Sequence, residues 1–266
     1  MKIGFIGTGN MGGALARAAA KGGHTLLLAN RTPAKAAALA KELGGTVCPN
    51  AEAAETAELL FLGVKPQGLP GLAGELAPVL QARKGNAPVV VSMATAVTLR
   101  ELDAMLGGGL PLIRIMPNTP AAVGAGTILY AAQNVTDAQL SAFRAVLAQA
   151  GLLLPLPEEK IDAASAISGC GPAFCFQFAD ALALGGVRAG LSYPDACRLA
   201  AQTMLGAAEM LLQGGEAPDV LKMRVCSPAG TTIEGVLALE QGGFSYTVQN
   251  AVTAAYRRTV EMTEKG

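Results

Sequence analysis

The most constraining feature of the sequence is its opening stretch, where a short apolar strand leads into three glycines spaced as G-x-G-x-x-G. An alanine-rich helix over 10–21 is expected to follow. In such a turn Gly7 permits a tight bend, Gly9 lets a pyrophosphate approach the backbone, and Gly12 lets the helix pack on the strand. The stretch therefore predicts a dinucleotide-binding loop formed by Gly7, Thr8, Gly9, Asn10, Met11 and Gly12. Chance coincidence is the alternative in a chain with 33 glycines, and the flanking strand and helix favour binding over chance.

The residues after the second expected strand, over 24–30, select between the two common dinucleotides. NAD enzymes usually place an acidic residue there to bind the ribose hydroxyls, whereas this chain has Asn30, Arg31 and Thr32. A guanidinium beside amide and hydroxyl donors suits a 2′-phosphate, which a carboxylate would repel. NADPH is therefore the expected cofactor, with NADH as the alternative. In a second reading Arg31 is a solvated surface residue and Thr32 caps the helix that begins at Pro33.

Strand and helix patterns alternate as far as residue 156. Further strands are expected over 46–47, 57–63, 88–92, 110–116, 126–131 and 152–156, and helices over 33–43, 67–81, 99–106 and 137–150. This alternation is typical of a doubly wound sheet, so the predicted fold class is α/β with an N-terminal Rossmann-type domain.

Two short segments follow expected strands at the end where open α/β sheets bind ligands. They are Val64-Lys65-Pro66 and Met93-Ala94-Thr95. Lys65 is therefore a candidate site residue, and a solvated loop lysine is the equally open alternative.

The pattern changes at Pro155-Leu156-Pro157, beyond which no strand is expected. The predicted domains are residues 1–156 and residues 157–266. The second is expected to be all helical, with helices over 161–187 with a kink at Pro172, from Ser192 to 213, after Pro218, after Gly230 and over 245–264. These helices carry more apolar positions than they can cover, so an interlocked dimer is expected.

The composition narrows the choice of partner and compartment. The net charge is zero and no basic block occurs, so small molecules are expected rather than nucleic acid. The chain is 51% hydrophobic, but Gly, Pro or charge interrupts every run of about 18 apolar residues, so no membrane span is expected. The five cysteines lack metal-binding spacing and are expected to be reduced thiols. The expected compartment is the cytoplasm.

The usual acid or base of a dehydrogenase is missing. His24, the only histidine, precedes the second strand and lies away from the strand ends that bind ligands. A carbonyl reductase must protonate an alkoxide, whereas a protonated imine becomes a neutral amine on accepting hydride. The absence of a histidine at the site therefore favours an imine substrate.

A second candidate site precedes the helix that contains Glu234, in the segment Ser227-Pro228-Ala229-Gly230-Thr231-Thr232. Free N–H groups at a helix start can hold a carboxylate, and the two threonine hydroxyls can reach a ring nitrogen. An ordinary capped helix is the alternative reading.

These motifs together resemble the pyrroline-5-carboxylate reductases, which complete proline synthesis. The resemblance spans nearly the whole chain and is carried by Gly7 to Gly12, Val64 to Pro66, Met116-Pro117-Asn118-Thr119-Pro120, Ser168 to Phe174 and Ser227 to Thr232. It implies reduction of the cyclic imine 1-pyrroline-5-carboxylate to L-proline by NAD(P)H.

The resemblance also implies roles for individual residues. Gly230, Thr231 and Thr232 would bind the substrate, and the Thr232 hydroxyl would bond the ring nitrogen as the catalytic contact. Lys65, the candidate from its place after a strand, is also expected to bind the substrate. Further cofactor contacts are implied at Asn50, Val64, Lys65, Pro66, Met93, Ala94 and Thr95. The C-terminal half would be a dimerisation domain of a homodimer or higher homo-oligomer, with each active site completed by the partner subunit.

Departures from the family pattern occur at Ala229, where glycine is typical, at Cys226, where threonine is common, and at Cys170, where serine is frequent. Alanine at 229 would be strained if that position needs positive φ. The β-hydroxyacid dehydrogenases share this layout but carry a lysine after a glycine pair on the first interdomain helix. No lysine follows Gly171 here, and the intact Thr231 and Thr232 argue against a non-catalytic NADP sensor.

Overall fold

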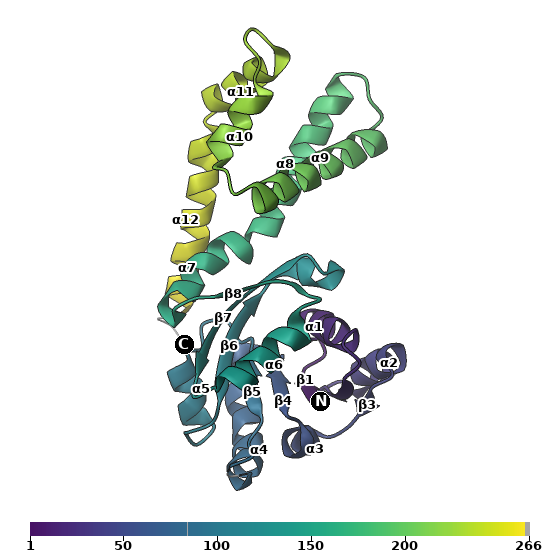
Figure 1. The fold of residues 1–266 in the computed structure, drawn as a ribbon, viewed down its shortest axis with the longest axis vertical. Helices are drawn as coiled ribbons and strands as arrows, with labels where there is room; N and C mark the ends of the chain where they lie inside the picture. The colour runs from purple at the N-terminus through teal and green to yellow at the C-terminus, as the bar shows by residue number, and fades with distance from the viewer. Residues whose placement is uncertain (84, 264–266) are drawn as a thin grey trace. The chain divides into compact units, whose positions relative to one another are not determined.

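The structure is a computed structural model that describes residues 1–83 and 85–263. The chain forms two compact units (Figure 1). The first comprises residues 1–169 together with the end of the last helix from Tyr256, and the second comprises Cys170–Ala255. The units therefore divide later along the chain than the domain boundary expected at 156/157.

The first unit contains a sheet in the order β3-β2-β1-β4-β5-β6-β7-β8. Its strands are β1 (Lys2–Ile6), β2 (Thr25–Ala29), β3 (Thr46–Val47), β4 (Leu59–Leu62), β5 (Val89–Ser92), β6 (Leu112–Pro117), β7 (Gly126–Gln133) and β8 (Gly151–Pro155). The pairs from β3 through β6 are parallel, as expected for a doubly wound sheet. β7 pairs antiparallel with β6 because the connection between them, which contains only the 3-10 helix η2 (Thr119–Val123), is too short for a crossover helix.

Helices cover both faces of this sheet. One buried cluster joins the sheet to α1 (Asn10–Ala20), α2 (Pro33–Leu43) and α6 (Asp137–Leu147). The other joins it to α3 (Asn50–Thr56), α4 (Leu69–Ala82), α5 (Leu99–Met105) and α7 (Glu158–Ser168). β1 and β4 are neighbouring interior strands, and the Phe5 and Phe61 rings that they carry stack with centroids 4.5 Å apart. Consecutive strand residues alternate between the two clusters, which explains why these strands are apolar throughout.

The structure differs from the expected elements in two places. The short helix α3 was not expected, and the helix expected over 161–187 is two helices, α7 and α8 (Gly171–Arg188). The break lies at Gly169 and Cys170, ahead of Pro172 rather than at it. Pro172 occupies the first turn of α8, where the missing N–H has no helical partner to lose.

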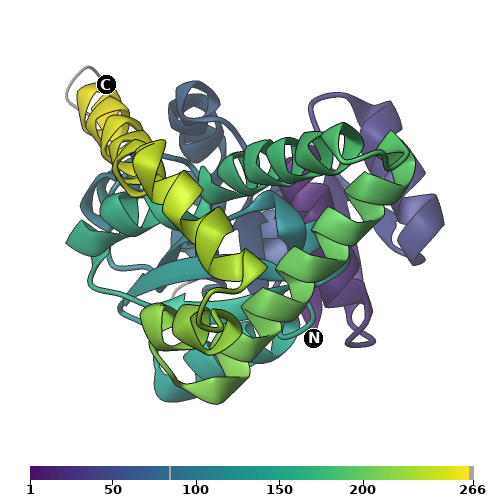
Figure 2. The same ribbon diagram turned by 90° about the horizontal axis from the view of Figure 1, so that it is seen from above.

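The second unit is helical. Its elements are α8, α9 (Tyr193–Gly214), α10 (Pro218–Val225), α11 (Thr231–Gln241) and the greater part of α12 (Phe244–Thr263). α8 and α9 form a hairpin whose turn contains Gly190 in a left-handed conformation (Figure 2). The Ser192 hydroxyl caps α9 by accepting a hydrogen bond from Asp195 N at 3.3 Å, as expected.

The second unit buries very little of its apolar surface. Its buried residues are Ala183, Ala196 and Ala200. Its large apolar side chains are instead exposed, among them Phe176, Leu184, Leu205, Leu212 and Tyr246. A unit that buries three alanines cannot rest on its own hydrophobic core, so these helices require a partner surface.

Candidate active site

The carboxyl ends of the parallel strands bring the predicted cofactor residues of the first unit together. Backbone hydrogen bonds join the strand ends: Gly7 N donates to Ala29 O at 2.8 Å, and Gly63 N donates to Ile6 O at 2.7 Å. Met93 N donates to Leu62 O at 3.3 Å. The loops after β1, β2, β4 and β5 therefore form one continuous edge, where α/β folds bind ligands.

Each glycine of the opening loop meets a different constraint. Gly7 has φ +99°, and a Cβ on it would lie 2.4 Å from Gly63 O. A Cβ on Gly12 would lie 2.0 Å from Gly7 O. Gly9 is exposed, and a Cβ on it would meet no described protein atom within 4 Å. The fold therefore explains Gly7 and Gly12, whereas the described protein atoms leave open space beside Gly9.

Thr8 and Asn30 connect the glycine loop to the loop after β2. Thr8 N donates to Asn30 Oδ1 at 3.0 Å, and Asn30 Nδ2 donates to Thr32 O at 3.0 Å. The Asn30 amide therefore braces two loops, a role that the sequence did not reveal. The buried Thr8 hydroxyl has no hydrogen-bond partner within residues 1–83 and 85–263, as expected of a group reserved for a ligand.

The residues predicted to read the 2′-phosphate are exposed. Arg31 and Thr32 lie at the surface after β2, and the Thr32 side chain does not cap α2. The alternative role for Thr32 as a helix cap is therefore absent from this structure. Both exposed side chains can therefore contact an anion bound beside the carboxyl end of β2.

Other predicted contacts lie on the same edge. Asn50 begins α3 and donates from Nδ2 to Glu75 Oε2 at 3.1 Å. Lys65 is exposed after β4, immediately before the 3-10 helix η1 (Pro66–Gly68). Ala94 is buried after β5, between the half-buried Met93 and Thr95.

The predicted substrate segment lies in the second unit. Gly230 N donates to Ser227 O at 3.0 Å, which closes a turn, and α11 then begins at Thr231. Gly230 is the residue before α11 and offers no capping side chain, so the first-turn amides stay available for a carboxylate. A Cβ on Gly230 would lie 2.2 Å from Ser227 Oγ and 3.1 Å from Ser227 O, so the serine hydroxyl would have to rotate to admit a larger residue.

Ala229 has φ +56°, which is the positive φ expected to strain an alanine at this position. An L-residue in this left-handed region costs about 1–2 kcal/mol. The hydrogen bond from Gly230 N to Ser227 O still closes this turn, although alanine replaces the glycine that is typical of the family at position 229. Ala96, in the loop after β5, has φ +61° and was not singled out from the sequence.

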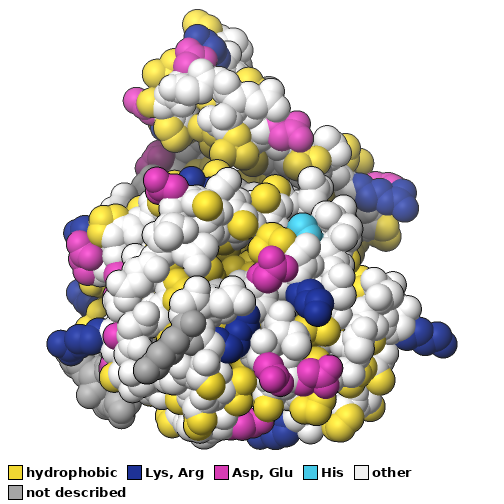
Figure 3. All heavy atoms as spheres, turned by 60° about the horizontal axis from the view of Figure 1, so that its bottom comes forward, with side chains coloured by type: hydrophobic (Ala, Val, Ile, Leu, Met, Phe, Trp, Pro, Cys, Tyr) yellow, Lys and Arg dark blue, Asp and Glu magenta, His cyan; other side chains and the backbone are white. Residues whose placement is uncertain are grey.

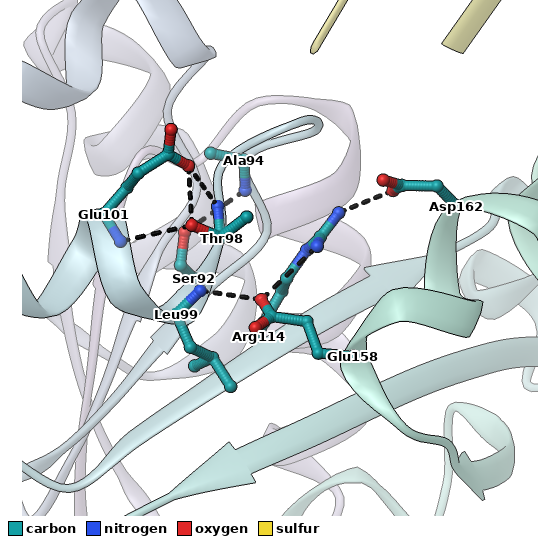
Figure 4. Close-up of polar contacts among 8 residues, drawn as sticks. All are labelled: Ser92, Ala94, Thr98, Leu99, Glu101, Arg114, Glu158 and Asp162. Atoms are coloured by element: carbon teal, nitrogen blue, oxygen red, sulfur yellow. Dashed lines mark hydrogen bonds and ion pairs between the residues drawn. The ribbon is translucent and has the colours of Figure 1, made fainter. Parts of the chain in front are cut away.

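Charged side chains of both signs are interspersed over the face of the molecule shown in Figure 3. Among the residues that the structure describes, Arg114 is a buried charged side chain, only 3% exposed. Its guanidinium pairs with Glu158 and Asp162 of α7 (Figure 4). The role of this arginine could not be predicted from the sequence, since nothing in an apolar strand pattern indicates a distant carboxylate partner.

The first unit fits a bound NADP. The glycine loop leaves open space at Gly9, Thr8 offers an unpartnered hydroxyl, and Arg31 supplies a positive charge after β2. A dinucleotide-binding sheet followed by a helical unit that cannot cover itself defines a class, the two-domain NADP-dependent oxidoreductases.

Comparison with known proteins identifies the family within this class. A family model described as pyrroline-5-carboxylate reductase dimerisation matches residues 158–262. A second, described as NADP oxidoreductase coenzyme F420-dependent, matches residues 2–96. The chain belongs to the pyrroline-5-carboxylate reductase family.

Individual relatives support this assignment along the whole chain. The pyrroline-5-carboxylate reductase of Synechocystis is 42% identical over 220 residues, which cover 81% of this chain and 79% of that protein. The crystal structure of Plasmodium falciparum pyrroline carboxylate reductase with NADP bound is 30% identical, has a TM-score of 0.85 and covers 99% of both chains. The structure of the Coxiella burnetii pyrroline-5-carboxylate reductase is 31% identical, has a TM-score of 0.90 and covers 97% of both chains.

Proposed function

We propose that this protein reduces 1-pyrroline-5-carboxylate to L-proline with NADPH, the last step of proline biosynthesis. Membership of the family supports this activity. The observation that carries the proposal to this chain is the uncapped start of α11, where Gly230, Thr231 and Thr232 are all present. That arrangement suits a small substrate with a carboxylate beside a ring nitrogen.

Some residues of this chain bind the substrate carboxylate, and another contacts the nitrogen of the C=N bond. When bound, NADPH supplies the hydride that the carbon of the C=N bond accepts. The first-turn amides of α11 hold the substrate carboxylate, and the positive end of the helix dipole favours that charge. The Thr232 hydroxyl bonds the ring nitrogen. No protein acid is needed, because a protonated imine becomes a neutral amine when it accepts hydride.

Cofactor choice rests on Arg31, which offers a guanidinium to a 2′-phosphate. Replacing Arg31 with alanine should lower kcat/KM for NADPH about 10- to 100-fold, the equivalent of one charge-assisted hydrogen-bond pair. The value for NADH should stay unchanged, because NADH has no phosphate there. Steady-state assays with pyrroline-5-carboxylate and each cofactor measure both values.

The same assay tests the proposed activity. Lys41→Ala, at the far end of α2, is the matched control and should leave both values unchanged, since Lys41 is exposed and distant from the loop. An unchanged NADPH preference in Arg31→Ala would remove Arg31 from the cofactor site. Wild-type protein without any substrate-dependent loss of NADPH absorbance would overturn the enzymatic proposal itself.

We also propose that the protein works as a homodimer or a larger homo-oligomer in which each active site uses α11 of the partner subunit. The exposed apolar side chains of the second unit and its match to the dimerisation model support assembly. The run Glu158–Arg188 is long and apolar enough to cross a membrane by length and composition alone, but it lies within the matched dimerisation segment. Sedimentation should give at least twice the 26.8 kDa of one chain, and a stable monomer would contradict the proposal.

A further inference from the structure

The loop after β5 holds a strained residue next to predicted cofactor contacts. Ala96 has φ +61°, a region that L-residues rarely adopt. It directly follows Met93, Ala94 and Thr95, which the family resemblance assigns to the cofactor. Backbone strain of this kind persists only where the surroundings fix the chain.

Local contacts fix both ends of this loop (Figure 4). At the start, Ser92 Oγ accepts a hydrogen bond from Ala94 N at 3.3 Å. At the end, Thr98 and Glu101 form a capping box in which Glu101 Oε2 accepts from Thr98 N at 2.7 Å. Hydrogen bonds from the Thr98 backbone and hydroxyl lower the pKa of the Glu101 carboxyl. Hydrogen bonds therefore hold both the start of this loop and the start of α5.

A residue far along the chain supplies a further anchor. Glu158, the first residue of α7, accepts a hydrogen bond through Oε1 from Leu99 N at 2.7 Å. Leu99 is the first residue of α5, so the carboxylate lies at the N-terminus of that helix, where the dipole favours an anion. Glu158 thus fixes the point at which the loop becomes a helix.

Arg114 holds Glu158 in this place. Its Nη1 lies 3.4 Å from Glu158 Oε1, and its Nη2 lies 2.6 Å from Asp162 Oδ1. On the sheet, Arg114 is the parallel partner of Ser92, the last residue of β5. The guanidinium therefore starts from the strand beside the base of the loop and pairs with two carboxylates of α7.

This pairing is costly if stability is its only purpose. Arg114 is 3% exposed, and its Nε has no hydrogen-bond partner in the described parts of the chain. The free energy lost when a buried charge is desolvated offsets much of the favourable free energy of its ion pairs. Proteins in which a buried ion pair is replaced by apolar residues are often as stable. A geometric role accounts better for a charged network at this place.

We propose that Glu158 and Arg114 are positioning residues for the cofactor, which hold the start of α5 and so shape the loop of Met93, Ala94 and Thr95. The proposal rests on the proposed function, in which that loop contacts NADPH. Glu158 also opens the segment matched by the dimerisation model. A residue of the dimerisation segment would thus set the cofactor affinity of its own subunit.

Three variants of Glu158 separate positioning from simple stability. Glu158→Ala removes the acceptor, and Glu158→Asp keeps the charge but withdraws it by one methylene from Leu99 N. Both should raise the Kd for NADPH about tenfold, the scale of a lost charged hydrogen bond. Glu158→Gln keeps an acceptor of the same reach and should return the Kd to within about threefold of wild type. Glu159→Ala is the matched control, since Glu159 is exposed in the same helical turn.

The readouts are fluorescence titration of NADPH, hydrogen exchange of residues 93–99 and the thermal midpoint. Exchange over 93–99 should rise in the alanine and aspartate variants and fall back in the glutamine variant. If Glu158→Ala does not fold, the comparison of aspartate with glutamine decides. A lower thermal midpoint with unchanged Kd in the aspartate variant would overturn the positioning role. Wild-type protein that binds no NADPH would instead refute the proposed function.

Discussion

Replacing Gly9 with alanine should weaken NADPH binding about 10- to 100-fold while the protein stays folded. The backbone at Gly9 has φ −70° and ψ −165°, which alanine adopts without strain. A Cβ there meets no described protein atom within 4 Å, so only a bound ligand can clash with it. An inserted methyl group in a close contact costs about 1–3 kcal/mol, which corresponds to the expected loss of affinity.

Alanine substitutions at two other glycines serve as comparisons for Gly9→Ala. Gly12→Ala should lower both affinity and stability, because its Cβ would lie 2.0 Å from Gly7 O. Gly74→Ala, in the middle of α4 with open space around it, should leave affinity unchanged. Calorimetric titration and thermal unfolding measure the two quantities. Gly9→Ala itself should lose no more than about 1 kcal/mol of unfolding free energy through its place before α1. Unchanged NADPH affinity in this variant would show that no ligand approaches the glycine loop.

The sequence predicted the first unit well because its strongest patterns are local. A strand, a glycine turn and a helix follow one another within the first residues, and apolar runs mark the buried parallel strands. The antiparallel direction of β7 was not predicted, since direction depends on the length of a connection rather than on the strand itself. α3 was missed because seven residues give too short a period to recognise.

The residues whose roles could not be predicted from the sequence depend on contacts between distant parts of the chain. Glu158 reaches Leu99 across 59 positions and Arg114 across 44. Neither spacing leaves a periodic trace, so only the fold brings these charges together. Asn30 lies directly after β2, where a cofactor contact was predicted, yet its Oδ1 accepts a hydrogen bond from Thr8 N, which turns part of its amide toward the protein itself. The roles of the individual site residues remain predictions that the experiments above address.

Replacing Thr232 with valine should lower kcat about 100-fold while the Kd for NADPH stays unchanged. Valine has nearly the shape of threonine and the same branching at Cβ, so the second position of α11 keeps its conformation. What disappears is the hydroxyl proposed to bond the ring nitrogen. Removing one polar group that contacts the reacting centre typically costs about 10²–10³ in turnover. Single-turnover hydride transfer, followed by NADPH absorbance, measures the step directly.

Two further variants test whether the missing hydroxyl causes the loss of turnover in Thr232→Val. Thr232→Ser restores the hydroxyl and should recover most of the turnover. Thr56→Val removes a hydroxyl that donates a hydrogen bond to Glu52 O at 2.8 Å in α3, and this variant should turn over like wild type. Thr56 precedes β4 and so lies at the opposite edge of the sheet from the glycine loop. Because α11 belongs to a unit without a core of its own, an intact sedimentation profile of Thr232→Val must accompany the kinetics. Wild-type turnover in a correctly assembled Thr232→Val protein would remove the hydroxyl from the reaction and leave carboxylate binding as the role of α11.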